Sequence, residues 1–505
     1  MRDGSSAADR IVTEAPTFTF DEKDGTALRQ AVARVTDLGY TEARTRERLG
    51  LEDLADLRWR ALPLYRRERL CDRDPLALLI DLFLLQGILP AEELARLFDP
   101  PAAEVLQRNG LLICDVQGSW RARASLYPVG NRLVVSDHAW PKLPHPGWHA
   151  IPFDLVMSIG TDSRWLSRTT SRKPVGSALD LCTGSGVHAL LAAAHAERVV
   201  AVDISPRAVQ CTRFNARLFG AANLKCLTGD LYQPVGEERF DLITANPPFV
   251  PSPVHTLGFR DGGKSGEEVQ RRIVEGLPRR LAPGGTAHIV TEIGESDAFS
   301  VADRVRGWLG DAPMDVVILR LREHSAETYA IGHAEGDYDF GEFLESVGEW
   351  SENLRQQGYA RVVSVLLFFR WSDPAAGPPW TRVETVTPPD RDAGGEVDAF
   401  FAMEKAARRD DISSCRIRRA HPLALTESFL LGGELRSKVR ARLLGKALTS
   451  EHWLEDLERD LLLMTGEEVE VSKQLARLHG IAASPSDAAM ALRSLLRRGL
   501  INIIP

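Results

Sequence analysis

The sequence has few cysteines, and their spacing does not match any metal site. The 505 residues include six of them, at Cys71, Cys114, Cys182, Cys211, Cys226 and Cys415. There is no Cys-x-x-Cys pair and no alternation of cysteine and histidine with ligand spacing. We therefore expect neither a disulfide framework nor a structural or catalytic metal.

The sequence also lacks a long apolar run. The most apolar stretch, Pro75 to Leu89, is interrupted by Asp81 and Gln86 and is too short to span a membrane. The first thirty residues mix basic and acidic side chains and contain no apolar core of a secretory signal. We therefore expect a cytoplasmic protein that has no membrane partner.

A net positive charge is missing as well. The chain has 62 basic and 70 acidic residues, a formal net charge of −8, which argues against a uniformly basic nucleic-acid binder. Hydrophobic residues make up 44% and charged residues 26%, as in ordinary globular proteins. At about 150 residues per domain, the length favours three domains, or two with a long appendage.

Composition and periodicity divide the chain into six segments. We expect a flexible leader (1–25), a helical, winged-helix-like N-terminal domain (26–136), a linker or lid (137–174), an α/β domain (175–372), a loop (373–395) and a mainly helical C-terminal domain (396–505). The winged-helix interpretation rests on short helices followed by β-like runs, 112–116 and 126–129, around the turn at Gly118. Such a module can bind nucleic acid, bind protein or only pack.

The α/β segment contains a glycine turn between a buried strand and a helix. The strand Ala178–Cys182 leads into Thr183-Gly184-Ser185-Gly186, and an Ala/Leu-rich helix, Val187–Ala196, follows. Glycines at such a turn let the backbone approach a ligand, and the helix N-terminus favours polar or anionic groups. The pattern predicts a ligand site at the carboxyl end of this strand.

Acidic residues follow the next strands at the same edge of the predicted sheet. Asp203 ends the second strand, about twenty residues after the glycines, where a carboxylate can accept both ribose hydroxyls. Gly229 and Asp230 follow the third strand, where an acid can reach an adenine amino group. A dinucleotide dehydrogenase would share these features, so they leave the reaction open.

The fourth strand ends in Asn246-Pro247-Pro248-Phe249, and this motif is the most specific in the chain. Together with 180–186, Asp203 and Asp230, it resembles the class I S-adenosylmethionine-dependent methyltransferases, in the branch that methylates planar or amide nitrogens. The segments 260–266, 271–273 and 283–285 are similar to those of the HemK-like protein-glutamine N-methyltransferases. The resemblance covers about residues 150–370, although the HemK group usually has tyrosine where this chain has Phe249.

The resemblance implies a Rossmann-like core, a seven-stranded and mostly parallel sheet, with S-adenosyl-L-methionine as cofactor. It implies cofactor contacts from Asp180, Thr183, Gly184, Ser185, Gly186, Asp203, Ile204, Gly229, Asp230, Leu231 and Asn246. The catalytic residues would be Asn246, Pro247, Pro248 and Phe249. Arg260, Asp261, Gly262 and Gly263 would form a substrate-side loop that is glycine-rich enough to move.

A planar nitrogen is a poor nucleophile because its lone pair is delocalised. Asn246 Oδ1 and the Pro247 carbonyl can accept its two N–H hydrogens and orient the lone pair toward the methyl group. The two prolines hold the turn rigid, and Phe249 can stack on the planar group. Positioning would then supply most of the catalysis.

The identity of the methyl acceptor stays open at this stage. A protein side chain or a nucleobase fits the large flanking segments somewhat better than a small-molecule or peptide natural product does. A chain of another class is a second possibility: a DNA-binding regulator that senses S-adenosylmethionine. The intact Asn246 and Phe249 favour catalysis, because a sensor has no need of them.

Overall fold

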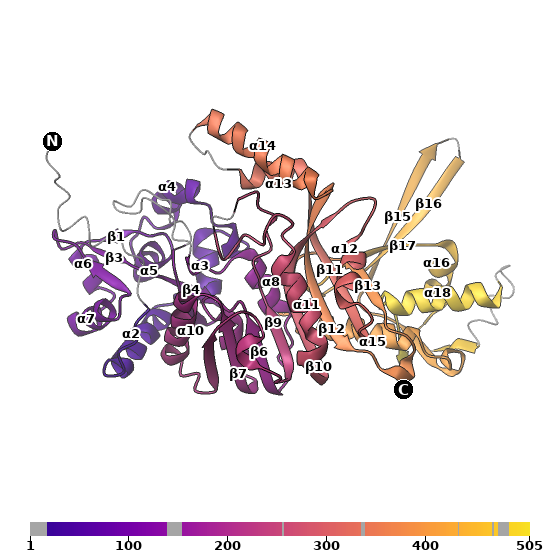
Figure 1. Ribbon diagram of the computed structural model, residues 1–505. Coiled ribbons are helices and arrows are strands. Elements are labelled where there is room, and N and C mark those ends of the chain that lie inside the picture. Colours follow the sequence, from indigo (N-terminus) through magenta and orange to yellow (C-terminus); the bar gives the residue numbers. More distant parts are fainter. Residues whose placement is uncertain are drawn as a thin grey trace.

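The computed structural model describes residues 18–138, 154–254, 257–334, 339–432, 434–466, 469–472 and 484–504. At its centre lies one mixed sheet of eight strands in the order β13-β11-β12-β10-β9-β6-β7-β8 (Figure 1). Only β12 runs against its neighbours, and the remaining pairs are parallel. The strands are β6 (Val175–Leu181), β7 (Ala196–Asp203), β8 (Leu224–Thr228), β9 (Phe240–Ala245), β10 (Leu281–Glu295), β11 (Met314–Ser325), β12 (Arg361–Trp371) and β13 (Thr381–Thr385).

The strand order places a ligand crevice next to β6. The chain runs outward from β6 through β7 to β8 and then returns to β9 on the other side of β6. The connections that leave the carboxyl ends of β6 and β9 therefore diverge, and open α/β sheets bind ligands at such a switch point. The Rossmann-like fold class predicted from the sequence is confirmed.

Helices cover both faces of this sheet. On one face lie α11 (Glu268–Arg280) and α12 (Val301–Leu309), whose apolar side chains pack on those of β6, β9 and β10. On the other face lie α8 (Thr161–Thr169), α9 (Val187–Ala192) and α10 (Pro206–Leu218). Both faces are apolar, as expected of strands buried between helices.

One expectation about the limits of this domain is wrong. The sheet has an eighth strand, because β13 pairs in parallel with β11 inside the segment 373–395 that was expected to be a loop. The segment 137–174, expected to be a linker or lid, contains helix α8, and its residues 139–153 lie outside the described ranges.

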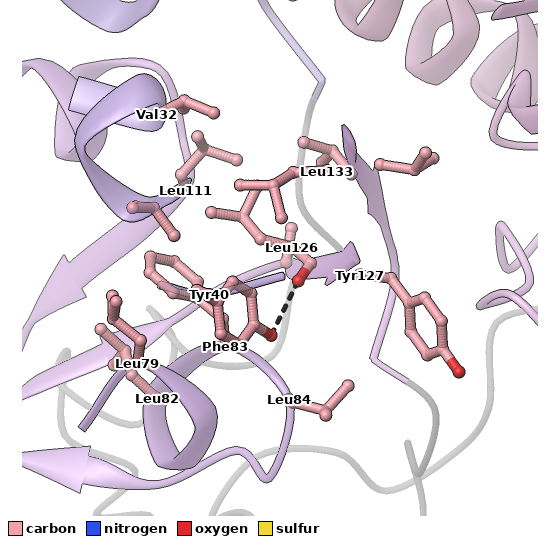
Figure 2. Close-up of a cluster of buried hydrophobic side chains, with 14 of the residues drawn as sticks. Val32, Tyr40, Leu79, Leu82, Phe83, Leu84, Leu111, Leu126, Tyr127 and Leu133 are labelled. Atoms are coloured by element: carbon pink, nitrogen blue, oxygen red, sulfur yellow. Dashed lines mark hydrogen bonds between the residues drawn. The ribbon is translucent and has the colours of Figure 1, made fainter. Parts of the chain in front are cut away.

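The N-terminal region forms a helical domain that shares a core with α9 and α10. Its helices are α2 (Gly25–Asp37), α3 (Glu42–Leu49), α4 (Leu62–Leu64), α5 (Pro75–Phe83), α6 (Ala91–Ala95) and α7 (Pro100–Arg108). Figure 2 shows the centre of this core, where the Tyr40 hydroxyl donates to the Leu126 carbonyl at 2.9 Å among leucine side chains. Of the expected leader, residues 18–25 are described, and there Phe18 and Phe20 are buried in this core rather than flexible.

The β-strands of this domain pair differently from the expected hairpin. Strand β2 (Leu112–Cys114) pairs with β3 (Trp120–Ala122), and β1 (Ile88–Leu89) completes a sheet in the order β1-β3-β2. The run near residue 126 is β4 (Ser125–Val129), which pairs with β5 (Arg132–Ser136). The winged-helix interpretation stays a prediction.

The C-terminal region is not mainly helical, contrary to the expectation. It contains α15 (Gly394–Ala407), α16 (Asp456–Met464) and α18 (Pro485–Arg497), but also β14 (Arg416–Arg419), β15 (Leu423–Gly432), β16 (Glu434–Leu443), β17 (Glu451–Leu454), β18 (Val469–Glu470) and β19 (Ile501–Ile504). Strands β15 and β16 form a long hairpin that extends from the body in Figure 1. Along β16, charged residues alternate with apolar ones, and the apolar residues Val439 and Ala441 are buried. This alternation is typical of a strand.

A helical hairpin is inserted between the antiparallel strands β11 and β12. It consists of α13 (Ala326–His333) and α14 (Phe340–Gln356), which lie at the top of the view in Figure 1. Tyr329 and Trp350 from these helices pack with Tyr359 and Val362 near the start of β12. Within the described ranges, we find no helix with both the length and the apolar character needed to cross a membrane.

Candidate functional site

A cavity of about 810 Å³ lies at the carboxyl ends of the central strands and brings together almost all predicted site residues. It is lined by the glycine turn, by the residues after β7 and β8, by the Asn246–Phe249 turn and by the Arg260–Gly263 loop. Of the predicted residues, Asp180 and Gly186 do not line it. The cavity joins the cofactor side and the acceptor side that the sequence predicted.

The two glycines of the turn have different roles. Both have left-handed backbone angles, with φ of 56° at Gly184 and 84° at Gly186. A Cβ on Gly184 would meet no atom within 4 Å, whereas one on Gly186 would approach Thr212 Cγ2 to 2.7 Å. Gly184 therefore leaves room for a ligand, and Gly186 lets the turn pack closely on α10.

Asp180 acts on the turn and not on the cavity. Its carboxylate accepts hydrogen bonds from the Thr183 hydroxyl (2.6 Å), the Thr244 hydroxyl (2.7 Å) and the Ala189 backbone N–H (3.2 Å). Burial raises the pKa of Asp180 to about 6, despite these hydrogen bonds. Asp180 therefore ties β6 to the turn and to β9, and its contact with the cofactor stays a prediction.

Asp203 lies where the sequence places it, at the end of β7. Its carboxylate accepts the backbone N–H of Gly184 and of Ser205, both at 2.9 Å, and so links the glycine turn to the start of α10. Burial raises the pKa of Asp203. The neighbouring Ile204 lines the cavity with a side chain that is 72% exposed, an apolar surface suited to a flat ring.

Asp230 lines the cavity beside Gly229 and Leu231, and it already has a partner. Arg272 of α11 donates to its carboxylate at 2.6 Å. Only one oxygen takes part in this bond, so the other retains its capacity to accept a hydrogen bond. Leu231 adopts a left-handed φ of 49° directly after Asp230.

The Asn246 amide is oriented by helix α8. Its Nδ2 donates to Asp162 Oδ2 at 2.7 Å and to Ser163 Oγ at 3.0 Å. Among the described residues no group donates to Asn246 Oδ1, which therefore keeps both lone pairs for a ligand. Burial, together with the nearby Glu292, raises the pKa of Asp162.

The substrate-side loop is packed against the Asn246–Phe249 turn. The Arg260 carbonyl accepts the Val250 N–H, and the Gly262 N–H donates to the Val250 carbonyl, both at 3.0 Å. A Cβ on Gly262 would lie 2.8 Å from the Pro248 carbonyl oxygen and 2.9 Å from Phe249 Cα. The glycine content that suggested a mobile loop serves here for close packing.

The acceptor side of the cavity contains residues to which the sequence assigned little. Glu292 lies near the end of β10, and its carboxylate accepts the Tyr329 hydroxyl at 2.6 Å and the Ser364 hydroxyl at 2.9 Å. His333 stacks on Tyr329 with ring centroids 4.1 Å apart and also lines the cavity. These residues come from β10, α13 and β12, which are distant in sequence, so no local motif reveals them.

Two observations indicate that this cavity fits a polar organic cofactor. His188 lines it, and its Nε2 is buried without a hydrogen-bond partner among the described residues. Burial lowers the pKa of His188 to about 3, so the ring is neutral. Together with the open space at Gly184, this leaves polar and apolar surface that the protein itself does not fill. No metal-binding group of acidic, histidine or cysteine side chains occurs within the part of the chain described.

Comparison with known families agrees with this geometry. Residues 158–297 match the family Methyltransferase small domain, and residues 37–123 match a domain of unknown function, DUF7059. The chain is 33% identical over 190 residues to the release factor glutamine methyltransferase of Bordetella pertussis, covering 34% of this chain and 67% of that protein. The chain belongs to the HemK-like class I methyltransferases.

Other relatives of this methyltransferase family match over shorter stretches. The ribosomal protein uL3 glutamine methyltransferase of Bradyrhizobium diazoefficiens is 41% identical over 130 residues, 23% of this chain and 40% of that protein. The tRNA1(Val) (adenine(37)-N6)-methyltransferase of Porphyromonas gingivalis is 36% identical over 112 residues, 20% of this chain and 44% of that one. The chain spans about half the length of most of the relatives it matches.

Among solved structures, the ribosomal protein L11 methylase of Lactobacillus delbrueckii subsp. bulgaricus is similar to this methyltransferase at 18% identity. It covers 41% of this chain and 75% of its own, with a TM-score of 0.25.

Proposed function

We propose that this chain is an S-adenosylmethionine-dependent N-methyltransferase that methylates a planar amide or amino nitrogen of a protein side chain or a nucleobase. The observation that carries the proposal is the orientation of Asn246. Its Nδ2 is held by Asp162 and Ser163, so its Oδ1 is left to accept an N–H from the acceptor.

The residues around the glycine turn would hold the cofactor. Thr183, Gly184 and Ser185 supply backbone and hydroxyl groups, Asp203 and Asp230 supply acceptors for hydroxyl and amino groups, and Ile204 and Leu231 supply apolar surface. When bound, S-adenosylmethionine supplies an electrophilic methyl group on a sulfonium. The predicted contacts from Asp180 and Gly186 act through the packing of the turn.

The chain's own residues then orient the acceptor. Asn246 Oδ1 and the Pro247 carbonyl accept the two N–H hydrogens of the planar nitrogen, which turns its lone pair out of conjugation and toward the methyl group. Pro247 and Pro248 restrict the turn, and the packed Gly262 supports it from behind. Phe249 lines the cavity and supplies a flat apolar surface for the planar group.

The names of the relatives support a macromolecular acceptor. Those cited above are named for glutamines of ribosomal protein uL3 and of release factors, and for a tRNA adenine. Both acceptor types present a planar N–H group of the kind that Asn246 and Pro247 can bind. None of the relatives cited above is named for a small-molecule or peptide natural product.

The test combines cofactor binding with methyl transfer. Purified full-length chain is incubated with methyl-labelled S-adenosylmethionine and an extract of its source cells from which the gene has been deleted. Label is then measured in RNA, DNA, protein and small-molecule pools. Asn246→Ala is expected to bind the cofactor within a few-fold of the unchanged chain by calorimetry and to lose transfer by about 100-fold.

Each result has a defined meaning. Label in the protein or nucleic-acid pool, absent with Asn246→Ala, supports the proposal and names the acceptor class. Label from Asn246→Ala at near the normal rate contradicts the mechanism. Tight cofactor binding without label in any pool contradicts the proposed function and favours the sensor, which operator-binding assays with and without cofactor would then test.

A further inference from the structure

A carboxylate lines the acceptor side of the cavity without a counter-charge. Glu292 accepts hydrogen bonds from two hydroxyls, those of Tyr329 (2.6 Å) and Ser364 (2.9 Å), one on each carboxylate oxygen. Among the described residues no arginine, lysine or histidine forms an ion pair with it. Glu295, three residues further along β10, is by contrast bound by Arg320 at 2.8 Å and by Arg361 at 2.9 Å.

The hydroxyls fix this carboxylate without neutralising it. Tyr329 is almost fully buried, and burial, together with the Glu292 charge, raises its pKa far above the usual range, so the phenol stays protonated and donates. Each Glu292 oxygen uses one lone pair on a hydroxyl and keeps another. The remaining acceptor capacity is available to a ligand in the cavity, which Glu292 lines.

Glu292 lies close to the Asn246 turn. Its charge contributes, after burial, to the raised pKa of Asp162, whose carboxylate holds the Asn246 amide at 2.7 Å. The Asn246 turn, Asp162 and Glu292 line the same cavity. A group bound at Asn246 Oδ1 is therefore within electrostatic reach of Glu292.

The rest of this wall also offers hydrogen-bond acceptors. His333 Nδ1 lies 3.0 Å from the Tyr329 carbonyl, which can only accept, so Nδ1 carries the proton. Burial lowers the pKa of His333, so the ring is neutral and its Nε2 is an acceptor. Arg260 is the nearby cation, but its guanidinium lies over the Trp350 ring, 5.7 Å from the centroid, and donates to Asp261.

We propose that Glu292 is an acceptor-binding residue, that Tyr329 and Ser364 are its positioning residues, and that the methyl acceptor presents an N–H donor or a positive charge to it. This inference rests on the proposed methyl transfer and adds the chemistry of the acceptor. A fixed carboxylate rejects a phosphate or carboxylate beside the reacting nitrogen, because like charges repel. Tyr329, His333 and Ser364 lie beyond residue 297, where the match to the family ends.

Charge movement during transfer strengthens this role. The lone pair of the acceptor nitrogen forms the new N–C bond while the S–C bond breaks and leaves its electron pair on sulfur. The positive charge thus passes from sulfur to nitrogen, and one N–H proton is then released to water. A carboxylate already oriented beside the nitrogen stabilises this arriving charge without reorganising.

The experiment compares Glu292→Gln, Glu292→Asp and Tyr329→Phe with the control Glu349→Gln, an exposed acid on α14. Initial rates of label transfer are measured with full-length protein against increasing amounts of the labelled extract pool, and cofactor affinity is measured by calorimetry. For Glu292→Gln, kcat/KM for the acceptor is expected to fall about 30- to 100-fold, the value of a charged hydrogen bond. Cofactor affinity is expected to stay within twofold.

The variants separate charge from shape. Glu292→Asp retains the charge and is expected to recover part of the lost rate, and Tyr329→Phe is expected to raise KM for the acceptor several-fold with little change in kcat. The control is expected to match the unchanged chain. If Glu292→Asp is as slow as Glu292→Gln, if Glu292→Gln also loses the cofactor, or if it keeps the full rate, the inference is overturned. Absence of label with the unchanged chain would instead overturn the proposed function, and the inference with it.

Discussion

At the scale of single residues, Asp180 gives the clearest dependence on pH. Burial raises its pKa to about 6 from the model-compound value of 3.8. The folded protein therefore binds this proton more tightly than the unfolded chain, and stability falls as pH rises from about 4 to about 6. Above that range the folded state retains a charged buried carboxylate, which the Thr183 and Thr244 hydroxyls stabilise only in part.

Asp180→Asn should remove this dependence. Between pH 4 and pH 7, the unfolding free energy of the variant should rise by about 2 to 3 kcal/mol relative to that of the unchanged chain. Urea unfolding at several pH values measures it, with Asp241→Asn as a control at a half-buried strand position. A difference that does not vary with pH would show that Asp180 titrates normally in the folded state.

Asp162 should control the orientation of the Asn246 amide. In Asp162→Asn the new amide can donate, so Asn246 is free to reverse and present its NH₂ to the cavity instead of Oδ1. The rate of methyl transfer is expected to fall by about 10- to 100-fold while the unfolding temperature changes little. Labelled transfer and thermal unfolding measure the two effects, and a rate within twofold of normal would mean that Ser163 alone orients the amide.

At the scale of elements, helix α8 connects the N-terminal domain to the site. Its first turn holds Asn246, and its middle carries Arg164, which is 2% exposed and pairs with Glu42 and Asp53 of the N-terminal domain. Arg168, one turn later, pairs with the same two carboxylates, at 3.2 Å from Glu42 and 2.7 Å from Asp53. The N-terminal domain thereby fixes the helix that orients the Asn246 amide.

The double variant Glu42→Gln with Asp53→Asn should therefore weaken both stability and transfer. It leaves a buried guanidinium without a counter-charge, which is expected to cost about 3 to 5 kcal/mol. The control Glu68→Gln removes the partner of Arg67 from an exposed ion pair and should cost less than about 1 kcal/mol. Denaturant unfolding and initial rates are compared, and a double variant with normal stability and rate would show that α8 is held by its apolar contacts alone.

The elements that the sequence predicted well are those with strong local signals. The buried strand before Gly184, the glycine turn and the strand before Asn246 all carry continuous apolar runs and turn residues, so their positions follow from local pattern. The Asn246–Phe249 turn and the ends of β7 and β8 line one cavity, as the sequence predicts, because parallel strands bring their carboxyl ends to one edge.

The elements that the prediction missed depend on contacts between distant segments. Strand β13 has only five residues and is defined by its pairing with β11, whose partner register no local pattern shows. Strand β16 alternates charged and apolar residues, but its apolar face is recognisable only once α16 and α18 pack on it. Glu292 lies near the end of a strand that the sequence predicts, but its hydrogen bonds depend on Tyr329 and Ser364, which lie 37 and 72 positions away.

At the scale of the whole molecule, the apolar cores show which parts depend on one another. One core joins the N-terminal domain to α9 and α10, so these two regions are expected to unfold together. A separate core lies within the C-terminal region and includes Leu492 and Leu495 of α18. Helix α15 contributes to two cores. Phe400 and Phe401 pack with α8 and the central sheet, whereas Ala407 belongs to the C-terminal core.

Two large-to-small substitutions should therefore destabilise different parts of the molecule. Phe401→Ala removes a ring that lies 5.5 Å from Trp380 and packs in the core shared with α8, so it should destabilise the cofactor-binding unit by about 3 kcal/mol. Leu492→Ala should cost a similar amount but confine it to the C-terminal region, leaving cofactor affinity unchanged. Hydrogen exchange followed by mass spectrometry resolves the two regions peptide by peptide. If both variants accelerate exchange equally in the glycine turn and in α18, the C-terminal region and the central sheet form one cooperative unit. Helix α15 would then transmit the loss of stability from one core to the other, because it contributes side chains to both.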